Sequence, residues 1–386
     1  MLNAAFDQPS LWQRARPIVF GFDPTLALAI AILAAFGMMT MYSAGFDHGT
    51  RFVDHGRNML IALAIMWAVS QVPPQRLMEL AAPIYLFGIA LLIATAVFGI
   101  SRKGATRWLN VGVTVIQPSE ILKLATPLML AWWFQTCEGR MRIGEWLVAA
   151  VILLLPFLLV AKQPDLGTAI LILSAGLYVL FFAGLSWQLI IPVMALGAAA
   201  IVALIVFEPT ICQPGVDWQV LKEYQKTRVC TLLDPSKDPL GKGFHILQGM
   251  IAIGSGGLTG KGFMQGTQTH LEFIPERTTD FIFAAFSEEF GLAGTIGLLL
   301  AFTFLIFRGL YIAAVAPTLF TRLLAGSITL SIFTYVFVNM GMVSGILPAV
   351  GIPLPFVSYG GTAMVTMGLA LGMLMSIARS RRLMQS

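Results

Sequence analysis

The sequence predicts an all-α fold: a polytopic membrane protein with ten transmembrane helices and a large extracytoplasmic loop between helices seven and eight. Hydrophobic residues make up 57% of its 386 positions and charged residues only 11%. This is more apolar sequence than a soluble core of this length can bury. The apolar residues also gather in windows long enough to span a bilayer, so residues 1–386 are predicted to form one transmembrane domain.

The ten predicted spans are apolar windows of helix-spanning length. They cover residues 24–43, 58–73, 77–98, 118–136, 144–161, 167–184, 188–207, 279–307, 321–344 and 357–378. The first window follows Arg14 and Arg16, as a signal-peptide core would. It is too long for such a core, however, and no small-residue cleavage site follows it. We therefore expect it to remain as the first span.

The positive charges of the short loops predict the orientation. The side of the termini carries Arg14, Arg16, Arg76, Arg140, Arg142, Arg308, Arg322, Arg379, Arg381 and Arg382. The opposite side carries Arg51, Arg57, Arg102, Lys103, Arg107 and Lys162. Because cytoplasmic loops carry the excess of lysine and arginine, both termini are predicted to be cytoplasmic. The long loop 208–277 then faces outward, and the absence of any basic run argues against a nucleic-acid partner.

The first outward loop, residues 44–57, contains two aspartates and two histidines, Asp47, His48, Asp54 and His55. Such residues can bind a metal ion. Because the loop has neither a cysteine nor a regular helical spacing, we favour a solvated loop.

The second outward loop, residues 99–117, places three cations, Arg102, Lys103 and Arg107, around Trp108. This combination suits a phosphate and the face of a sugar. It is also what a tryptophan at the membrane interface with neighbouring cations would look like.

Glu120 and Lys123 follow on one face of the next predicted helix, three residues apart. An unpaired lysine in a span costs about 2.5–3.5 kcal/mol on insertion scales, and pairing with the glutamate relieves this cost. The pair either fixes helix packing or belongs to a functional site.

Two more carboxylates stand at outward helix entrances. Asp165 follows a proline at the start of the sixth span, and Asp280 follows Arg277 and Thr279 at the start of the eighth. Each could cap its helix, but an ionisable residue in such a place is also a candidate functional residue. Together with Glu120, they predict a polar cavity that opens outward.

The large loop divides into two halves. Cys212 and Cys230 in the first half could form a disulfide on the oxidising side of the membrane, whereas Cys137 should stay reduced. The second half has an amphipathic stretch, residues 246–253, that could lie in the membrane interface. Six glycines then lie between Gly254 and Gly266, with Lys261 among them, which suits a flexible hinge or an anion-binding backbone.

Beyond Asp280, Glu288 and Glu289 lie about 12–13 Å deeper along the same predicted helix. Charges at that depth must face protein or water, and we expect basic partners from neighbouring spans. The proline-rich loop 345–361, which contains Ser358, is expected to close one wall of the cavity.

Four motifs resemble those of the SEDS family (shape, elongation, division and sporulation). They lie at residues 266–284, 117–123, 163–168 and 355–361. Two features are more similar to the elongation branch of the family than to its division branch. They are Gly266-Thr267-Gln268 with Leu271-Glu272-Phe273, and residues 345–348.

The resemblance implies a peptidoglycan glycosyltransferase of the bacterial inner membrane that polymerises lipid II outside the cytoplasm. Asp280 would be the general base for the GlcNAc 4-hydroxyl of the acceptor, and undecaprenyl pyrophosphate would leave. The candidate substrate-binding residues are Arg102, Lys103, Arg107, Trp108, Glu120, Lys123, Asp165, Arg277, Thr279 and Ser358. No organic cofactor is expected, but a divalent cation, Mg²⁺ or Mn²⁺, could help to hold the pyrophosphate.

The resemblance also implies partners: the nascent glycan strand, membrane lipids, elongation-complex proteins and a class B penicillin-binding protein that cross-links the product. The main alternative is a flippase for the lipid-linked precursor, and a further one is the division branch of the family. A transporter needs polar groups near the midplane, whereas most polar groups here lie at the outer helix ends. Glu288 and Glu289 are the exception and keep that alternative open.

Overall fold

The structure is a computed structural model. It describes residues 22–385 apart from 48, 103–104, 111, 113–114, 139–141, 164, 214–215, 217–225, 227–228, 232, 235–240 and 275. Several residues of the sequence predictions lie outside the described residues, namely Lys103, His48, Arg14, Arg16 and Arg140. The side chains of Arg102, Arg381 and Arg382 lie outside them as well.

Long helices dominate the molecule. They are α2 (Pro24–Ala44), α3 (Arg51–Ser70), α4 (Pro74–Glu79), α5 (Ala81–Phe98), α6 (Pro118–Thr136), α7 (Ile143–Lys162), α8 (Leu166–Phe182), α9 (Trp187–Ile211), α13 (Ile282–Ala314), α14 (Leu319–Val343) and α15 (Gly361–Gln385). Each predicted span therefore coincides with helix. Within the described part of the chain, seven helices are long and apolar enough to cross a membrane: α2, α5, α7, α9, α13, α14 and α15. The predicted class, an α-helical membrane protein, is confirmed, while the number of ten spans stays a prediction.

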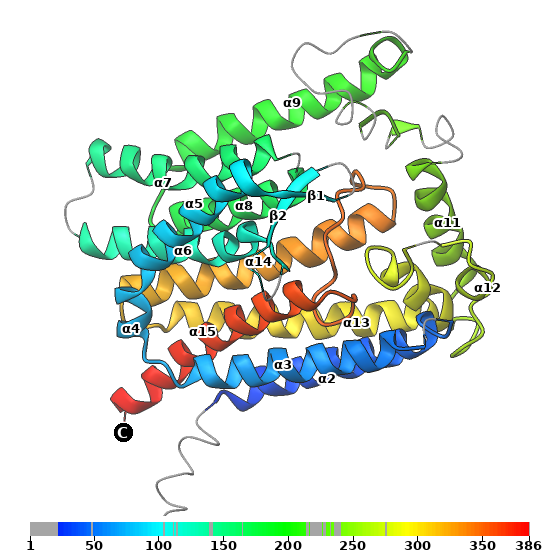
Figure 1. The fold of residues 1–386 in the computed structure, drawn as a ribbon, viewed down its shortest axis with the longest axis horizontal. Helices are drawn as coiled ribbons and strands as arrows, with labels where there is room; N and C mark the ends of the chain where they lie inside the picture. The colour runs from blue at the N-terminus through cyan, green and yellow to red at the C-terminus, as the bar shows by residue number, and fades with distance from the viewer. Residues whose placement is uncertain are drawn as a thin grey trace, which may run out of the picture.

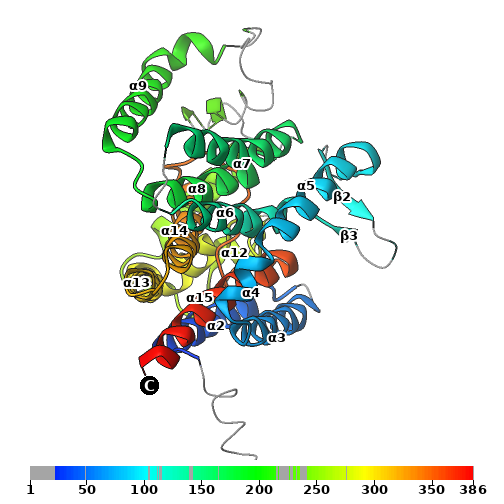
Figure 2. The same ribbon diagram turned by 90° about the vertical axis from the view of Figure 1, so that its left-hand side faces the viewer.

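The long helices pack lengthwise into one bundle (Figure 1). Helix α3 lies against α15, α13 lies between α2 and α14, and α6 contacts α5 and α8. Their facing side chains form a continuous apolar core that includes Leu33, Phe134, Phe286 and Phe320. Helix α9 stands apart from this core, as Figure 2 shows, and none of its most hydropathic window is buried.

The loop 99–117 is more ordered than the sequence predicted. It forms a three-stranded antiparallel sheet of β1 (Ile100–Arg102), β2 (Ala105–Asn110) and β3 (Val115–Ile116), in the order β1-β2-β3. The sheet leads directly into α6, whose first residue is Pro118. Its position beside the start of α6 places β2 at the rim of the bundle.

The large loop between α9 and α13 is tied to the bundle. Cys212 and Cys230 are joined by a disulfide with their Cα atoms 5.6 Å apart, and Cys137 is a free cysteine. The amphipathic stretch forms α11 (Lys242–Ser255), which buries Ile246 and Ala252 and packs on α13. Part of its apolar face therefore covers the protein, while Ile251 is exposed, and the interfacial location stays a prediction.

The glycine-rich stretch after α11 packs across a break in α13. At Gly291 the backbone adopts φ 63° and ψ −162°, so the helix is interrupted there. The N–H groups of Leu292 and Ala293 bond the carbonyls of Gly257 and Leu258 at 2.9 and 3.0 Å. A Cβ at Gly291 would lie 2.2 Å from the nitrogen of Gly260. These glycines therefore allow close backbone packing, which argues against a free hinge.

Candidate functional site

A polar cavity of about 620 Å³ opens at the end of the bundle where α13 begins. Its walls come from β2, the first turns of α6 and α8, the start of α13 and the loop 345–360. The polar side chains that line it are Arg107, Gln117, Glu120, Lys123, Asp165, Thr168, His245, Glu276, Thr279, Asp280, Tyr359 and Thr362. Six of the candidate residues from the sequence thus meet in one place, since Arg107, Glu120, Lys123, Asp165, Thr279 and Asp280 are all among them.

Asp280 lies in the turn that leads into α13 and faces this cavity. The turn is closed by the N–H groups of Thr279 and Phe281, which both bond the carbonyl of Glu276 at 3.1 Å. Thr279 also donates its hydroxyl hydrogen to Glu276 Oε2 at 2.8 Å. The N-cap of α13 is Phe281, which has no side chain that can cap. The carboxylate of Asp280 is therefore held in the cavity wall at the mouth of α13.

Glu120 and Lys123 form the predicted ion pair at the inner end of the cavity. Lys123 Nζ lies 2.6 Å from Glu120 Oε1 and 3.0 Å from the hydroxyl of Tyr335 in α14. Thr366 of α15 donates to Glu120 Oε2 at 3.1 Å. The lysine is 7% exposed, so its charge is paired almost entirely within the protein. The pair both links three helices and presents charge to the cavity.

Asp165 similarly combines the two roles that the sequence left open. Its Oδ1 accepts from the N–H of Thr168 at 3.3 Å, which caps α8. The same carboxylate lies 3.6 Å from Arg107 Nη1 and accepts from Gln117 Nε2 at 3.0 Å. Asp165 thereby holds the guanidinium of Arg107 in β2 and the amide of Gln117, the N-cap of α6, at the cavity wall.

Three candidate residues do not line this cavity. Trp108 follows Arg107 in β2, and successive strand residues point to opposite faces, so the tryptophan turns away. Arg277 is 4% exposed and points to the end of α2, where it donates to the Ala44 carbonyl at 3.0 Å and pairs with Asp47. Ser358 accepts from the N–H of Leu354 at 2.7 Å and so stabilises the loop 345–360.

The structure also adds residues that the sequence predictions missed. Glu276 and His245 line the cavity beside Asp280, and His245 packs its ring 5.9 Å from that of Phe281. Glu276 lies in the motif 266–284, from which only Arg277, Thr279 and Asp280 were candidates. His245 comes from the large loop, so no local pattern could place it at this wall.

The charges of the lining are mostly negative. The described lining has four carboxylates, Glu120, Asp165, Glu276 and Asp280, and two permanent cations, Arg107 and Lys123. Within the described ranges, no group of three or more histidine, cysteine, aspartate or glutamate side chains could hold a metal ion. The protein therefore offers no preformed metal centre in this part of the chain, including the loop that contains Asp47, Asp54 and His55.

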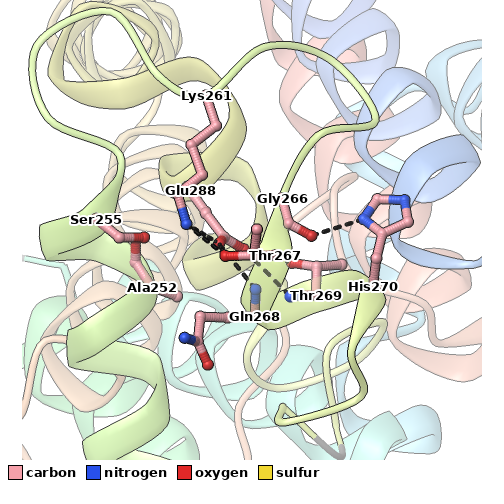
Figure 3. A network of polar contacts seen from close by, with 9 residues as sticks. All are labelled: Ala252, Ser255, Lys261, Gly266, Thr267, Gln268, Thr269, His270 and Glu288. Atoms are coloured by element: carbon pink, nitrogen blue, oxygen red, sulfur yellow. Dashed lines mark hydrogen bonds and ion pairs between the residues drawn. The ribbon is translucent and has the colours of Figure 1, made fainter.

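Glu288 and Glu289 lie outside this cavity. Figure 3 shows Glu288 surrounded by its hydrogen-bond donors. Glu288 is fully buried and accepts from Lys261 Nζ at 2.7 Å, from Thr267 Oγ1 at 3.1 Å, and from the backbone and hydroxyl of Thr269 and the backbone of Gln268 at 2.9–3.2 Å. Glu289 accepts a hydrogen bond from Ser43 of α2. The basic partner of Glu288 is thus a loop residue, and the prediction of partners from neighbouring spans is wrong.

The comparison with known families decides the identity of the fold. Residues 24–383 match the family model FTSW_RODA_SPOVE, described as cell cycle protein. The chain belongs to this family. The resemblance to the SEDS family that the motifs indicated is therefore confirmed.

The most similar relatives cover nearly the whole chain. The peptidoglycan glycosyltransferase MrdB of Escherichia coli (strain K12) is 47% identical over 363 residues, which are 94% of this chain and 95% of MrdB. A probable peptidoglycan glycosyltransferase FtsW of Aeromonas salmonicida (strain A449) is 34% identical over 377 residues, 94% of this chain and 91% of that protein. Among solved structures, a chain from a peptidoglycan synthase complex that coordinates polymerization and crosslinking has a TM-score of 0.74 and 31% identity, covering 93% of this chain and 98% of that chain.

Proposed function

We propose that the protein is a peptidoglycan glycosyltransferase that polymerises lipid II into glycan strands during cell elongation. The observation that carries this proposal is the placement of Asp280 in a cavity that also contains Arg107 and Lys123. A carboxylate can accept a proton there, while the cations face the phosphate groups of a substrate. The 47% identity to the peptidoglycan glycosyltransferase MrdB supports the activity, and residues 271–273 and 345–348 favour the elongation branch.

Asp280 acts as the general base in this proposal. It accepts the proton of the acceptor GlcNAc 4-hydroxyl, and that oxygen forms the new bond to C1 of the donor MurNAc. The bond between C1 and the pyrophosphate oxygen breaks, and its electron pair leaves with undecaprenyl pyrophosphate. General-base catalysis of this kind contributes about 10²–10⁴-fold to the rate.

The cations of the cavity stabilise the leaving pyrophosphate. Arg107 is held by Asp165 at 3.6 Å, and Lys123 is held by Glu120 at 2.6 Å, so both are oriented before substrate arrives. Preorganised charges are effective because no reorganisation is needed as negative charge develops. Lys103 and Arg102 remain proposed contacts, together with Thr279 at the rim.

A divalent cation is a separate part of the proposal. The described residues lack a metal-ligand cluster, so an Mg²⁺ or Mn²⁺ ion would need oxygen ligands from the substrate pyrophosphate itself. Such an ion would share with Arg107 and Lys123 the stabilisation of the negative charge on the leaving pyrophosphate.

The location and the partners follow from the same proposal. The protein would lie in the bacterial inner membrane with both termini in the cytoplasm and the cavity facing the periplasm. A class B penicillin-binding protein would cross-link the new strand, which the structural match to a chain of a peptidoglycan synthase complex supports. The flippase alternative rested on Glu288 and Glu289, and it has less support from Glu288, because that carboxylate accepts from five donors of the protein.

The test is polymerisation of labelled lipid II by the purified protein together with a class B penicillin-binding partner. Moenomycin silences contaminating glycosyltransferases of the other family. We compare wild type with Asp280→Asn, which removes the base with little change of shape. The matched control is Asp54→Asn, since Asp54 is a carboxylate outside the cavity, 3.0 Å from Arg57.

We expect long glycan from wild type and from the Asp54→Asn control, and none from a well-folded Asp280→Asn protein. Glycan from Asp280→Asn at the wild-type rate would refute the role of the base. No glycan from any variant, with lipid II moved across liposomes by all of them, would favour the flippase.

A further inference from the structure

Asn339 is a polar residue buried inside an apolar helix close to the cavity. It lies in α14 and is 0% exposed. Its side-chain nitrogen donates two hydrogen bonds, to the backbone carbonyl of Asp280 at 3.0 Å and to that of Ile352 at 2.7 Å. Because both partners are carbonyl oxygens, only the NH₂ group of the amide can face them. The orientation of this side chain is therefore defined by its contacts.

These two carbonyls belong to two neighbouring segments of the cavity wall. Asp280 stands at the mouth of α13, and Ile352 lies in the loop 345–360. The residue before Ile352 is Gly351, whose φ of +74° favours glycine. A Cβ there would lie 3.2 Å from Asp280 Oδ2. One amide thus holds the backbone of Asp280 and the loop that touches its carboxylate.

The other side of the same turn is held by different elements. Thr278 accepts at its carbonyl from the N–H of Tyr359 at 2.8 Å and at its hydroxyl from Arg51 of α3. Arg277 is fixed to the end of α2 through the Ala44 carbonyl at 3.0 Å. Asn339 supplies the attachment to α14, so the turn is held from both sides.

We propose that Asn339 is a positioning residue for Asp280. By fixing the carbonyl of Asp280 and the adjacent loop, it sets where the carboxylate meets the acceptor hydroxyl. A misplacement of about 1 Å at a reacting group can cost about 100-fold in rate. This inference rests on the proposed function, in which Asp280 is the base.

The test compares Asn339→Leu with a matched control in the same helix. Leucine has a similar size but no donor, so it leaves the carbonyls of Asp280 and Ile352 without this partner. The control is Ser327→Ala, because Ser327 is also 0% exposed in α14 and donates to a backbone carbonyl, that of Ala175 at 2.7 Å, away from the cavity. Both variants are measured for kcat and KM with lipid II and for Tm in detergent.

We expect Asn339→Leu to lower kcat by about 10- to 100-fold with KM changed less than about threefold. Ser327→Ala should leave kcat within about twofold of wild type, even if it lowers Tm as much as Asn339→Leu does. A wild-type kcat for Asn339→Leu would overturn the inference. It would also be overturned if Ser327→Ala had the same Tm as Asn339→Leu and lost as much kcat.

A second variant keeps the inference testable if Asn339→Leu does not fold. Gly351→Ala adds a methyl group beside the Asp280 carboxylate at an exposed loop position. We expect the same signature, a lower kcat with little change in KM, and an unchanged kcat would count against positioning. Asp280→Asn, measured in parallel, tests the base separately: if it polymerises like wild type, the proposed function fails whatever Asn339 does.

Discussion

Two carboxylates that are close in the sequence have opposite surroundings. Asp280 is partly exposed and lines the cavity, whereas Glu288, further along α13, is fully buried and accepts from five donors of the protein. A carboxylate whose oxygens are filled by the protein stabilises the fold, because each donor compensates for lost hydration. A carboxylate that faces a cavity keeps room for a ligand. Burial and position relative to the cavity, and not the residue type, distinguish the two roles.

The sharpest test of this comparison replaces each carboxylate by alanine. Glu288→Ala leaves Lys261 without its charge partner, and we expect a loss of about 3–5 kcal/mol in the free energy of unfolding. Asp280→Ala should leave that free energy within about 0.5 kcal/mol and remove the polymerase activity. Denaturation in detergent and the lipid II assay measure the two effects. Loss of activity without loss of stability in Glu288→Ala would break the comparison.

The Glu120–Lys123 pair shares features of both Asp280 and Glu288, because it lines the cavity and is also nearly buried. Lys123→Met leaves Glu120 without its cation, and we expect a loss of about 3–5 kcal/mol in stability as well as a loss of activity. Membrane yield, Tm and the lipid II assay are the measurements. The double variant Glu120→Gln with Lys123→Met should recover stability but not activity. Recovery of both would show that the pair has only a packing role.

The break in α13 at Gly291 tests how tightly the protein packs near Glu288. Gly291→Ala forces a Cβ to within 2.2 Å of the Gly260 nitrogen at φ +63°, so we expect a loss of about 2 kcal/mol or more. Gly297→Ala in the same helix is the control, because its nearest atom, Phe36 Cζ, is 4.0 Å away. That variant should be neutral or more stable by up to about 1 kcal/mol. Equal Tm values for the two variants would contradict the close packing of the loop on α13.

A third carboxylate gives the smallest effect. Burial raises the pKa of Asp23, but hydrogen bonds from Arg308 and from the Leu26 N–H lower it more, so the pKa lies below its ordinary value. The ionised carboxylate of Asp23 therefore stabilises the folded state fully above about pH 4, near its unfolded-state pKa. This stabilisation is lost as the pH falls through the lower pKa of the folded state. Asp23→Asn should cost about 1–2 kcal/mol at pH 7.

The pH dependence of Tm in detergent checks this last expectation. The difference in Tm between wild type and Asp23→Asn should shrink as the pH is lowered below about 4. A difference that stays constant with pH would show that the ionised form of Asp23 has no special role.

The sequence predicted the parts of the site that depend on local spacing. The Glu120–Lys123 contact follows from two residues three apart on one helix, and Asp165 and Asp280 stand at helix starts that hydropathy alone defines. It could not distinguish Arg107 from Trp108, because the sheet that turns them to opposite faces was not predicted. Arg277 was misplaced for a related reason, since its partners Asp47 and Ala44 belong to a distant helix end.

By itself, the sequence determined the membrane class and the helix positions, because bilayer thickness and helix geometry impose them on each segment separately. The family followed from four local motifs. Only the tertiary structure decided which charges meet: Lys261 with Glu288, Arg107 with Asp165, and Asn339 with the carbonyl of Asp280. The physical reason is that a buried polar group takes whichever partner the packing of remote segments brings within hydrogen-bond distance. Spacing along the chain carries no information about that partner.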